Sequence, residues 1–237
     1  MPGGFFGKLP AMNTTRKIQL IAAAAIVALI VAYFGYGAYQ KRQATDAVIA
    51  MVTDTASRLS TMLKTADVDP STPDAAAAQQ RLDAELSTAQ QHLARLRALD
   101  GSRIRPLADT AYEYINTSVE ILRRKAVSNG HRLQLAVSLQ ALREHMQTDN
   151  RSGTWVTEAI RRKERMERDF RDYQRAADAL VKLLGDYPVS RRRMADFVDA
   201  GLLPTDEAVE SAGSRTLAAV RTTTAEVKQS GRLDAYR

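Results

Sequence analysis

The chain has 237 residues, a formal net charge of +7 and no cysteine, so its sequence excludes disulfides, thiolate metal sites and a cysteine nucleophile. Hydrophobic residues make up 45% of the chain but aromatic residues only 6%, because alanine supplies much of the apolar content. This composition favours helices that pack closely on one another, and the length suits one sizeable domain together with an anchor.

The first expected element is an apolar stretch from Ile18 to Tyr39, in which no side chain is charged. As a helix its 22 residues would rise about 33 Å, enough to cross a hydrocarbon core of about 30 Å. Aromatic side chains gather at one end, as they do where membrane helices meet headgroups: Tyr33, Phe34, Tyr36 and Tyr39. We predict a tail over residues 1–17 and a single transmembrane anchor over residues 18–40, in preference to a cleaved signal peptide or a buried soluble helix.

The charges that flank this stretch predict its orientation. Bases precede it at Lys8, Arg16 and Lys17 and follow it at Lys41 and Arg42, with Arg58 at the limit of the counted window, so the two counts are nearly equal and tilt slightly to the N-terminal side. Because cytoplasmic flanks carry the excess of Lys and Arg, we expect the N-terminus to be cytoplasmic. The Ala- and Arg-rich composition suggests a bacterial protein, so the expected location is the inner membrane, with the larger C-terminal domain in the periplasm.

Small residues recur on one face of the predicted anchor, at Ala24, Ala28, Ala32 and Gly35. Such a stripe lets two membrane helices approach closely, which makes these four residues candidates for membrane-helix packing. The competing interpretation is that alanine is simply common throughout this protein.

Beyond the anchor the chain shows helical periodicity. Apolar residues at spacings of three and four predict a helix over residues 41–66 that continues the anchor helix. Further helices are predicted over residues 73–99 and from residue 103 onwards, after the turn sequences DVDPST and DGS. The sequence SNG at residues 128–130 interrupts the third helix, which is either one kinked rod or two short helices.

The longest apolar seam follows a break at residues 148–153. Its members recur at helical spacing: Val156, Ile160, Lys163, Met166, Phe170, Tyr173, Ala177, Leu180 and Leu184. Gly185 and Pro188 predict the end of this helix. A short helix is expected over residues 190–200, and a weaker one after Thr205, which is a suitable N-cap.

Together these elements predict an all-α fold. A single transmembrane helix continues into an antiparallel three- or four-helix bundle, since connections of about four to six residues favour antiparallel neighbours. The predicted bundle spans residues 41–185, and residues 186–237 form a small helical C-terminal extension with a frayed end.

The sequence contains no motif that is typical of an enzyme. It has neither a phosphate-binding glycine loop nor a nucleophile elbow nor a helical zinc motif. The three histidines, His92, His131 and His145, are expected to be ordinary surface or edge residues. We therefore predict no catalytic residue, no metal and no cofactor.

The segment RRKERMERDFRDYQR, residues 161–175, is the most prominent basic feature. Acids interleave its bases at helical spacing: Glu164 precedes Arg168 by four residues, and Glu167 precedes Arg171 by four. We therefore interpret the segment as a solvated, salt-bridged helix face rather than a surface for nucleic acid or anionic lipid.

Two smaller groups of arginines are candidates for binding. Arg191, Arg192 and Arg193 fall at the start of the predicted short helix, where cations oppose the helix dipole, so we predict that they contact a partner or lipid headgroups. A second set is a candidate for contact with a small anion: Arg103, Arg105, Arg123 and Arg124.

The layout of residues 18–185, an apolar helix that runs into a long first bundle helix, resembles the four-helix-bundle sensing domains of bacterial chemoreceptors. The resemblance implies a periplasmic bundle that binds a ligand. The sequence departs from those receptors because it has no second stretch near eighteen apolar residues for a return through the membrane.

The leading hypothesis is a single-pass, membrane-anchored helical bundle that is not an enzyme and acts as an interaction or scaffold subunit of the bacterial cell envelope. Its partners would be the membrane and another envelope protein or a second copy of itself. One alternative is a periplasmic four-helix sensory domain for a small anion. Another is a cytoplasm-facing basic domain that binds nucleic acid or anionic lipid, although we do not expect nucleic acid as a partner.

Overall fold

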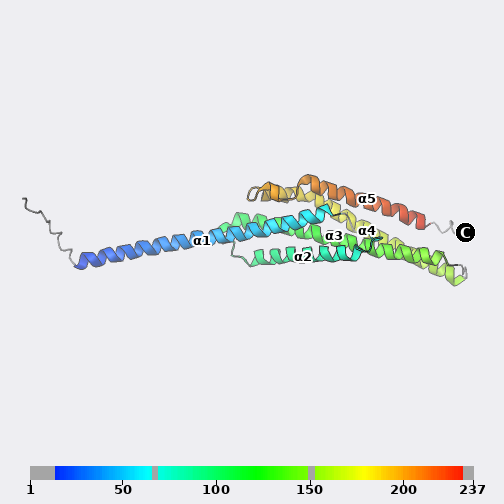
Figure 1. The fold of residues 1–237 in the computed structure, drawn as a ribbon, viewed down its shortest axis with the longest axis horizontal. Helices are drawn as coiled ribbons and strands as arrows, with labels where there is room; N and C mark the ends of the chain where they lie inside the picture. The colour runs from blue at the N-terminus through cyan, green and yellow to red at the C-terminus, as the bar shows by residue number, and fades with distance from the viewer. Residues whose placement is uncertain (1–13, 66–68, 149–152, 232–237) are drawn as a thin grey trace, which may run out of the picture. The chain divides into compact units, whose positions relative to one another are not determined.

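The computed structural model describes residues 14–65, 69–148 and 153–231, without the side chains of residues 14–24, 28, 30 and 34. Within these ranges the chain is all-α, as predicted. Its elements are α1 (Thr14–Lys64), α2 (Ala75–Ala98), η1 (Ser102–Ile104), α3 (Arg105–Met146), α4 (Gly153–Met194), η2 (Ala200–Leu202) and α5 (Asp206–Ser230) (Figure 1). The predicted tail up to residue 13 and the predicted frayed end from residue 232 lie outside the described residues.

Contacts divide the chain into two units, residues 1–45 and residues 46–237. α1 contributes to both units as one helix, which confirms the predicted continuity between the apolar stretch and the first bundle helix. The described large apolar and aromatic side chains of the first unit are more than half exposed: Ile26, Val27, Leu29, Val31, Tyr33, Tyr36 and Tyr39. Among the residues that the structure describes, no helix is both long enough and apolar enough to span a membrane.

The stripe of small residues in α1 is only partly described. The side chains of Ala24 and Ala28 lie outside the description, whereas Ala32 and Gly35 are exposed. Apart from its own stretch of helix, no atom in the described part of the chain would lie within 4 Å of a Cβ at Gly35. Membrane-helix packing through these residues therefore stays a prediction.

In the second unit five helices pack as a bundle whose consecutive members are antiparallel (Figure 1). Contacts between consecutive helices run in opposite directions along the two members, so that later residues of one helix meet earlier residues of the next: Thr55 with His92 and Arg58 with Glu85, Gln79 with Ala126 and Arg97 with Tyr112, Tyr114 with Tyr187 and Ser138 with Asp169. The last turn of α4 likewise meets the first turn of α5 through Arg191 and Asp206. The predicted antiparallel packing is confirmed. α5 adds a fifth helix to the bundle, since it buries Val209 and Val227.

α3 and α4 are the longest helices that lie wholly in the second unit, with 42 residues each. α3 passes through the SNG sequence as one helix and buries Ser128 and Asn129 there. α4 passes through Gly185 and Pro188, so the predicted helix end at that point is wrong.

The turn around Pro188 shows why the local signal fails. A proline inside a helix removes one backbone donor and crowds the preceding turn. This part of α4 nevertheless buries Tyr187, Ser190 and Met194 against the bundle, and such packing outweighs local preference. The separate helix predicted over residues 190–200 is therefore wrong, because its first residues form the last turn of α4.

The buried seam of α4 confirms the prediction from Met166 to Leu184 but not before it. Val156 and Ile160 are 48% and 47% exposed, and Ala159 is buried instead. Ala159, Met166 and Tyr173 are spaced seven residues apart. The predicted seam instead reached Met166 through Ile160 and Lys163, at two successive spacings of three residues. A seven-residue repeat holds one face towards the neighbouring helices, so the structure follows that repeat.

The C-terminal end of α1 is held by cations from two other helices. Lys125 of α3 is 5% exposed, and its Nζ donates to the carbonyl oxygens of Met62 at 2.8 Å and Thr65 at 3.3 Å. Arg215 of α5 donates to the carbonyl oxygen of Leu63. The last carbonyls of a helix have no partner within it and carry its negative pole, so these cations satisfy and stabilise the end of α1.

We expect Lys125→Met to lower the free energy of unfolding by about 2 kcal/mol, because it leaves buried carbonyl groups without a charged donor. Methionine keeps most of the apolar stem. Urea denaturation of the full chain in detergent measures the change, and Arg124→Met, at the exposed neighbouring position, is the control. Equal losses in the two variants would contradict the capping role.

A second buried polar contact joins α1 to α2. His92 is 8% exposed, and its Nδ1 lies 3.1 Å from Thr55 Oγ1 while its Nε2 lies 3.5 Å from Asp54 Oδ2. Arg58 bridges the helices beside it, with ion pairs to Asp54 at 2.7 Å and to Glu85. The expectation that all three histidines are surface or edge residues is thus wrong for His92. Its burial lowers its pKa, and Asp54 opposes this shift only in part.

The lowered pKa of His92 predicts a loss of stability in acid. Between its usual value of 6.5 and the lower value in the folded state, the unfolded chain binds the proton more readily than the folded chain. The free energy of unfolding should therefore fall as the pH falls below about 6.5. We expect His92→Gln to flatten this dependence in denaturation experiments between pH 7.5 and pH 5.5, whereas the control His131→Gln should keep the wild-type slope.

Candidate functional site: an arginine groove between α3 and α4

A groove of about 470 Å³ lies between the second half of α3 and the first half of α4. We call it the arginine groove and define it by its lining residues: Val137, Ser138, Ala141, Glu158, Arg161, Arg162, Arg165 and Arg168. Four of these eight side chains are arginines and one is an acid. The groove therefore concentrates positive charge against a small apolar wall.

Helical spacing places the arginines on one side of α4. Arg161, Arg165 and Arg168 are four and three residues apart, which brings them onto a single helix face. Another face of the same helix buries Met166 and Tyr173 in the core. The groove face is therefore kept outward by the packing of the seam.

α3 supplies the apolar wall and a fixed register. Val137 is 62% exposed, and Ala141 is partly buried. Between them, Ser138 Oγ donates to Asp169 Oδ2 of α4. This hydrogen bond and the shared core hold the two helices side by side along the groove.

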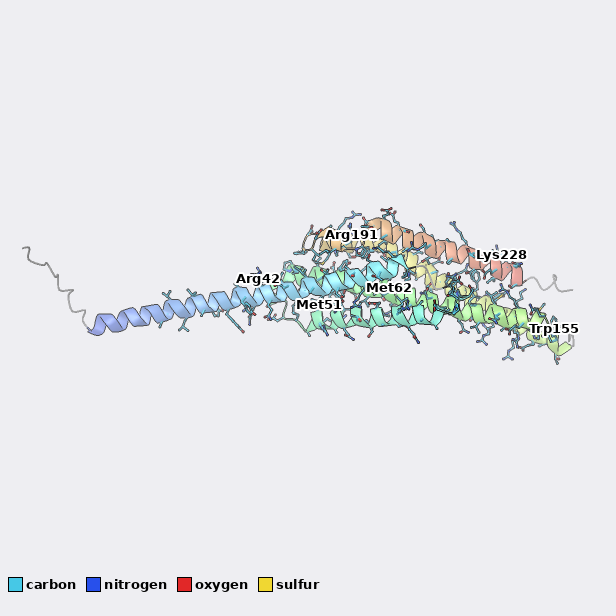
Figure 2. All side chains as sticks on the ribbon, viewed as in Figure 1. Arg42, Met51, Met62, Trp155, Arg191 and Lys228 are labelled. Atoms are coloured by element: carbon cyan, nitrogen blue, oxygen red, sulfur yellow. The ribbon has the colours of Figure 1, made fainter. Side chains whose placement is uncertain are left out.

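The ends of α3 and α4 clasp each other beyond the groove. His145 Nε2 lies 2.9 Å from the carbonyl oxygen of Trp155, and Trp155 Nε1 donates to the carbonyl oxygen of His145 at 3.1 Å. Their rings are stacked with centroids 5.1 Å apart. Figure 2 shows Trp155 at this end of the helix pair. The reciprocal contact limits opening of the helix pair and therefore preserves the shape of the groove.

Only part of the positive charge in the groove is neutralised. Glu158 accepts a hydrogen bond from Arg162 Nε at 2.9 Å and lies 3.9 Å from Arg161 Nη1. Arg162 Nη1 also donates to the carbonyl oxygen of Ala141 at 3.2 Å. Arg165 and Arg168 form no hydrogen bond or ion pair with any residue in the described part of the chain. These two guanidinium groups are the free cations of the groove.

The predicted salt-bridged face forms only in part. Glu164 and Arg168, and likewise Glu167 and Arg171, make no ion pair within 4.0 Å in the described structure, while Arg175 lies 3.6 Å from Asp172. All these side chains are long and mostly solvated, so the small gain from pairing does not hold them together. The solvated face and the pair of Asp172 with Arg175 are therefore confirmed, whereas the pairs predicted for Glu164 with Arg168 and for Glu167 with Arg171 are not formed in the described structure.

Arg191, Arg192 and Arg193 lie in the last turn of α4 rather than at a helix start. There they complement the helix dipole, so the local anomaly that suggested a partner contact does not exist. Arg191 lies 3.7 Å from Asp206 of α5, and Arg193 lies 2.7 Å from Glu113 of α3. Figure 2 shows Arg191 beside α5. Partner or lipid contact by these three arginines stays a prediction.

The four arginines proposed for a small anion are not gathered. Arg105 pairs with Asp109 at 3.6 Å, and Arg123 pairs with Glu120 at 3.0 Å. Arg103 precedes the first pair in η1, and Arg124 follows the second. Arg105 and Arg123 are separated by about 27 Å along α3, because each helical residue rises about 1.5 Å. A small anion cannot contact Arg105 and Arg123 at the same time.

The buried tyrosines of α3 and α4 form a structural contact between these two helices. Tyr114 and Tyr187 are fully buried, and their hydroxyl oxygens lie 3.0 Å apart. Burial raises the pKa of Tyr114 to about 12 and also raises the pKa of Tyr187 above its usual range. Both phenols therefore stay protonated at neutral pH and join α3 to α4 by a hydrogen bond. Among the described residues, no three His, Asp or Glu side chains gather as a metal site would require.

Sequence reasoning missed the α3 side of the arginine groove. Val137, Ser138 and Ala141 lie at least 17 residues before Glu158, the first groove residue of α4, and no local pattern links them to it. One signal for the α4 side was present. Arg161, Arg165 and Arg168 share a helix face, and their spacings of four and three residues are visible in the sequence.

No protein-family model, no curated protein and no solved structure matches this chain. The candidate site therefore stands on its charge and geometry, and the two free arginines are its most distinctive feature.

We expect Arg165→Gln to leave the fold intact and to raise the free energy of unfolding by a few tenths of a kcal/mol at low salt. It removes repulsion from three neighbouring arginines on the helix without removing a partner, whereas Arg168→Gln should change stability little, since two acids and two bases lie three or four residues from it. Arg162→Gln should instead lower stability, since it loses Glu158 and the carbonyl group of Ala141. Urea denaturation at 20 mM and 1 M NaCl measures these changes, and the gain should vanish at high salt. A marked loss of stability in Arg165→Gln would contradict the assignment of that residue as free.

Proposed function

We propose that this protein is a single-pass, membrane-anchored helical bundle that acts as an interaction or scaffold subunit of the bacterial cell envelope and performs no catalysis. One observation carries the proposal. α1 is a single helix from Thr14 to Lys64, so the apolar stretch and the first helix of the bundle belong to one element.

Two features support the anchor. Residues 18–39 carry no charged side chain over a length that suits a hydrocarbon core. The described side chains of this stretch are exposed around the helix, including Ile26, Leu29 and Val31. A large contiguous apolar surface in water is rare in a monomeric protein, and lipid would cover it. The flanking bases favour a cytoplasmic N-terminus and a periplasmic bundle in the inner membrane.

The arginine groove supports the interaction role. It presents free cations beside apolar side chains on a rigid pair of helices, which is a suitable surface for an anionic partner. The partner would be another envelope protein or a second copy of this chain. The sensory alternative is not part of the proposal, because its candidate arginines lie in two separate places and two of them, Arg105 and Arg123, already pair with acids of α3.

The anchor is tested by placing charge at its centre. We expect the wild-type chain to stay with the membrane pellet after an alkaline carbonate wash. Ile26→Arg combined with Leu29→Arg should release much of it, since each central arginine costs about 2.5–3.5 kcal/mol of insertion free energy. Gln40→Arg, at the edge of the stretch, is the matched control and should remain in the pellet. Release of the wild-type chain by the wash would contradict the anchor.

The orientation is tested with reporters fused to the C-terminus that are active on only one side of the inner membrane. We expect activity from the periplasmic reporter and none from the cytoplasmic one. The reverse result would contradict the envelope assignment and would direct attention to anionic lipid or nucleic acid as ligands of the basic surface.

A further inference from the structure

We propose that the arginine groove binds an amphipathic helix of a partner protein whose acidic residues are spaced by four and three along one face. This inference rests on the proposed role as an interaction subunit, and it names the chemistry of the partner. It assigns Arg161, Arg165 and Arg168 as the specificity-determining side chains and Val137 as the apolar contact.

The charge of the groove calls for an anionic partner. Glu158 offsets one of the four arginines, and Arg165 and Arg168 keep their full charge without a partner in the described structure. Neighbouring arginines on this face repel one another, and the acids beside them in the helix form no ion pair with Arg165 or Arg168 within 4.0 Å in the described structure. A carboxylate-bearing partner relieves this repulsion, and each guanidinium can hold a carboxylate through two parallel hydrogen bonds.

The spacing of these arginines favours a helix over a compact anion. Arg161 and Arg168 are seven residues apart, so their backbone positions are separated by about 10 Å along α4. A small anion contacts neighbouring guanidinium groups but cannot extend along the whole row. A partner helix that lies along α4 presents acids at the same spacing, since three- and four-residue steps recur on one face of any helix.

The apolar wall requires an occupant with two kinds of surface. Val137 is 62% exposed, and Ala141 stands one turn further along the same side of α3. A helix with acids on one flank and small apolar residues beside them would cover both parts of the groove at once. Nucleic acid would satisfy the arginines and leave the apolar wall exposed. The combined surface therefore favours an acidic amphipathic helix.

Binding is measured with the full-length protein in detergent micelles and a fluorescent 21-residue helical peptide. The peptide carries glutamates at four- and three-residue steps along one face and alanine or leucine beside them. Its control has the same composition, with the glutamates distributed around the helix. Fluorescence anisotropy at 150 mM NaCl should give at least tenfold tighter binding for the patterned peptide. Equal affinities would overturn the inference.

The site is tested with two double variants that remove the same charge. Arg165→Gln/Arg168→Gln should weaken binding of the patterned peptide at least tenfold. Arg124→Gln/Arg171→Gln removes two exposed arginines outside the groove and should change it less than twofold. Similar losses in both variants would show a general charge effect and overturn the inference. Displacement of the peptide by equimolar pyrophosphate or by a short single-stranded DNA would also overturn it.

The apolar contact has an independent test, because the chain contains no cysteine. Val137→Cys should form a disulfide with a cysteine placed at an apolar position of the patterned peptide, under mild oxidation. Val189→Cys, exposed near the other end of α4, should not. Equal trapping at both positions would overturn the inference.

The outcome is separable from the proposed function by membrane fractionation of the same variants. If the groove variants and the wild type all stay in the membrane pellet and the patterned peptide does not bind, this inference fails while the anchored scaffold stands. If the wild-type chain leaves the membrane, the proposed function fails whatever the peptide does.

Discussion

The capture of the C-terminal end of α1 is the interaction on which the described bundle depends. A helix leaves its last carbonyl groups without internal partners, so an end that lies inside a bundle requires donors from elsewhere. Lys125 and Arg215 supply them from α3 and α5, which are distant in sequence. The same contacts that satisfy α1 therefore fix the positions of two other helices around it.

The antiparallel pair of α3 and α4 carries the rest of the architecture. Its buried tyrosine pair lies towards one end and the His145–Trp155 clasp lies at the other, so the helices are joined at widely spaced points. Between these points the seam of α4 faces the core and its arginines face solvent. Because the core fixes the helix rotation, the free cations of the groove are held in place without partners of their own.

The fold tolerates these charges because their mutual repulsion is small compared with the apolar burial of α4. Repulsion between exposed arginines on one helix face amounts to only a few tenths of a kcal/mol per pair. The buried seam of α4 contributes far more through apolar burial. A binding surface with unpaired cations can therefore be maintained at small expense to the fold.

Helical periodicity made much of the bundle predictable from the sequence. Val48, Val52, Leu59 and Met62 form the buried face of α1 as their spacing predicts, because one apolar stripe is sufficient to orient a helix. The length of α4 was not predictable from local signals. Gly185 and Pro188 are strong stop signals, and they are overridden by Tyr187, whose partner Tyr114 lies 73 residues earlier.

The candidate site was predictable only on one side. The basic character of residues 161–175 is plain in the sequence, but the rule for charge pairs four residues apart predicted ion pairs that solvated side chains do not keep. The apolar wall from α3 depends on helix pairing, and the location of Arg191 in a last turn depends on the extended α4. The apolar wall and the location of Arg191 both depend on tertiary packing, which local sequence patterns do not reveal.

Amide hydrogen exchange of the full-length chain, followed by mass spectrometry, tests the central role of the α1 end most directly. We expect residues 46–64 to exchange as slowly as the cores of α3 and α4 in the wild type. Lys125→Met/Arg215→Met should accelerate exchange in this segment first, while the α3–α4 pair stays protected. Rapid exchange of residues 46–64 in the wild type, or unchanged protection in the double variant, would contradict this central role.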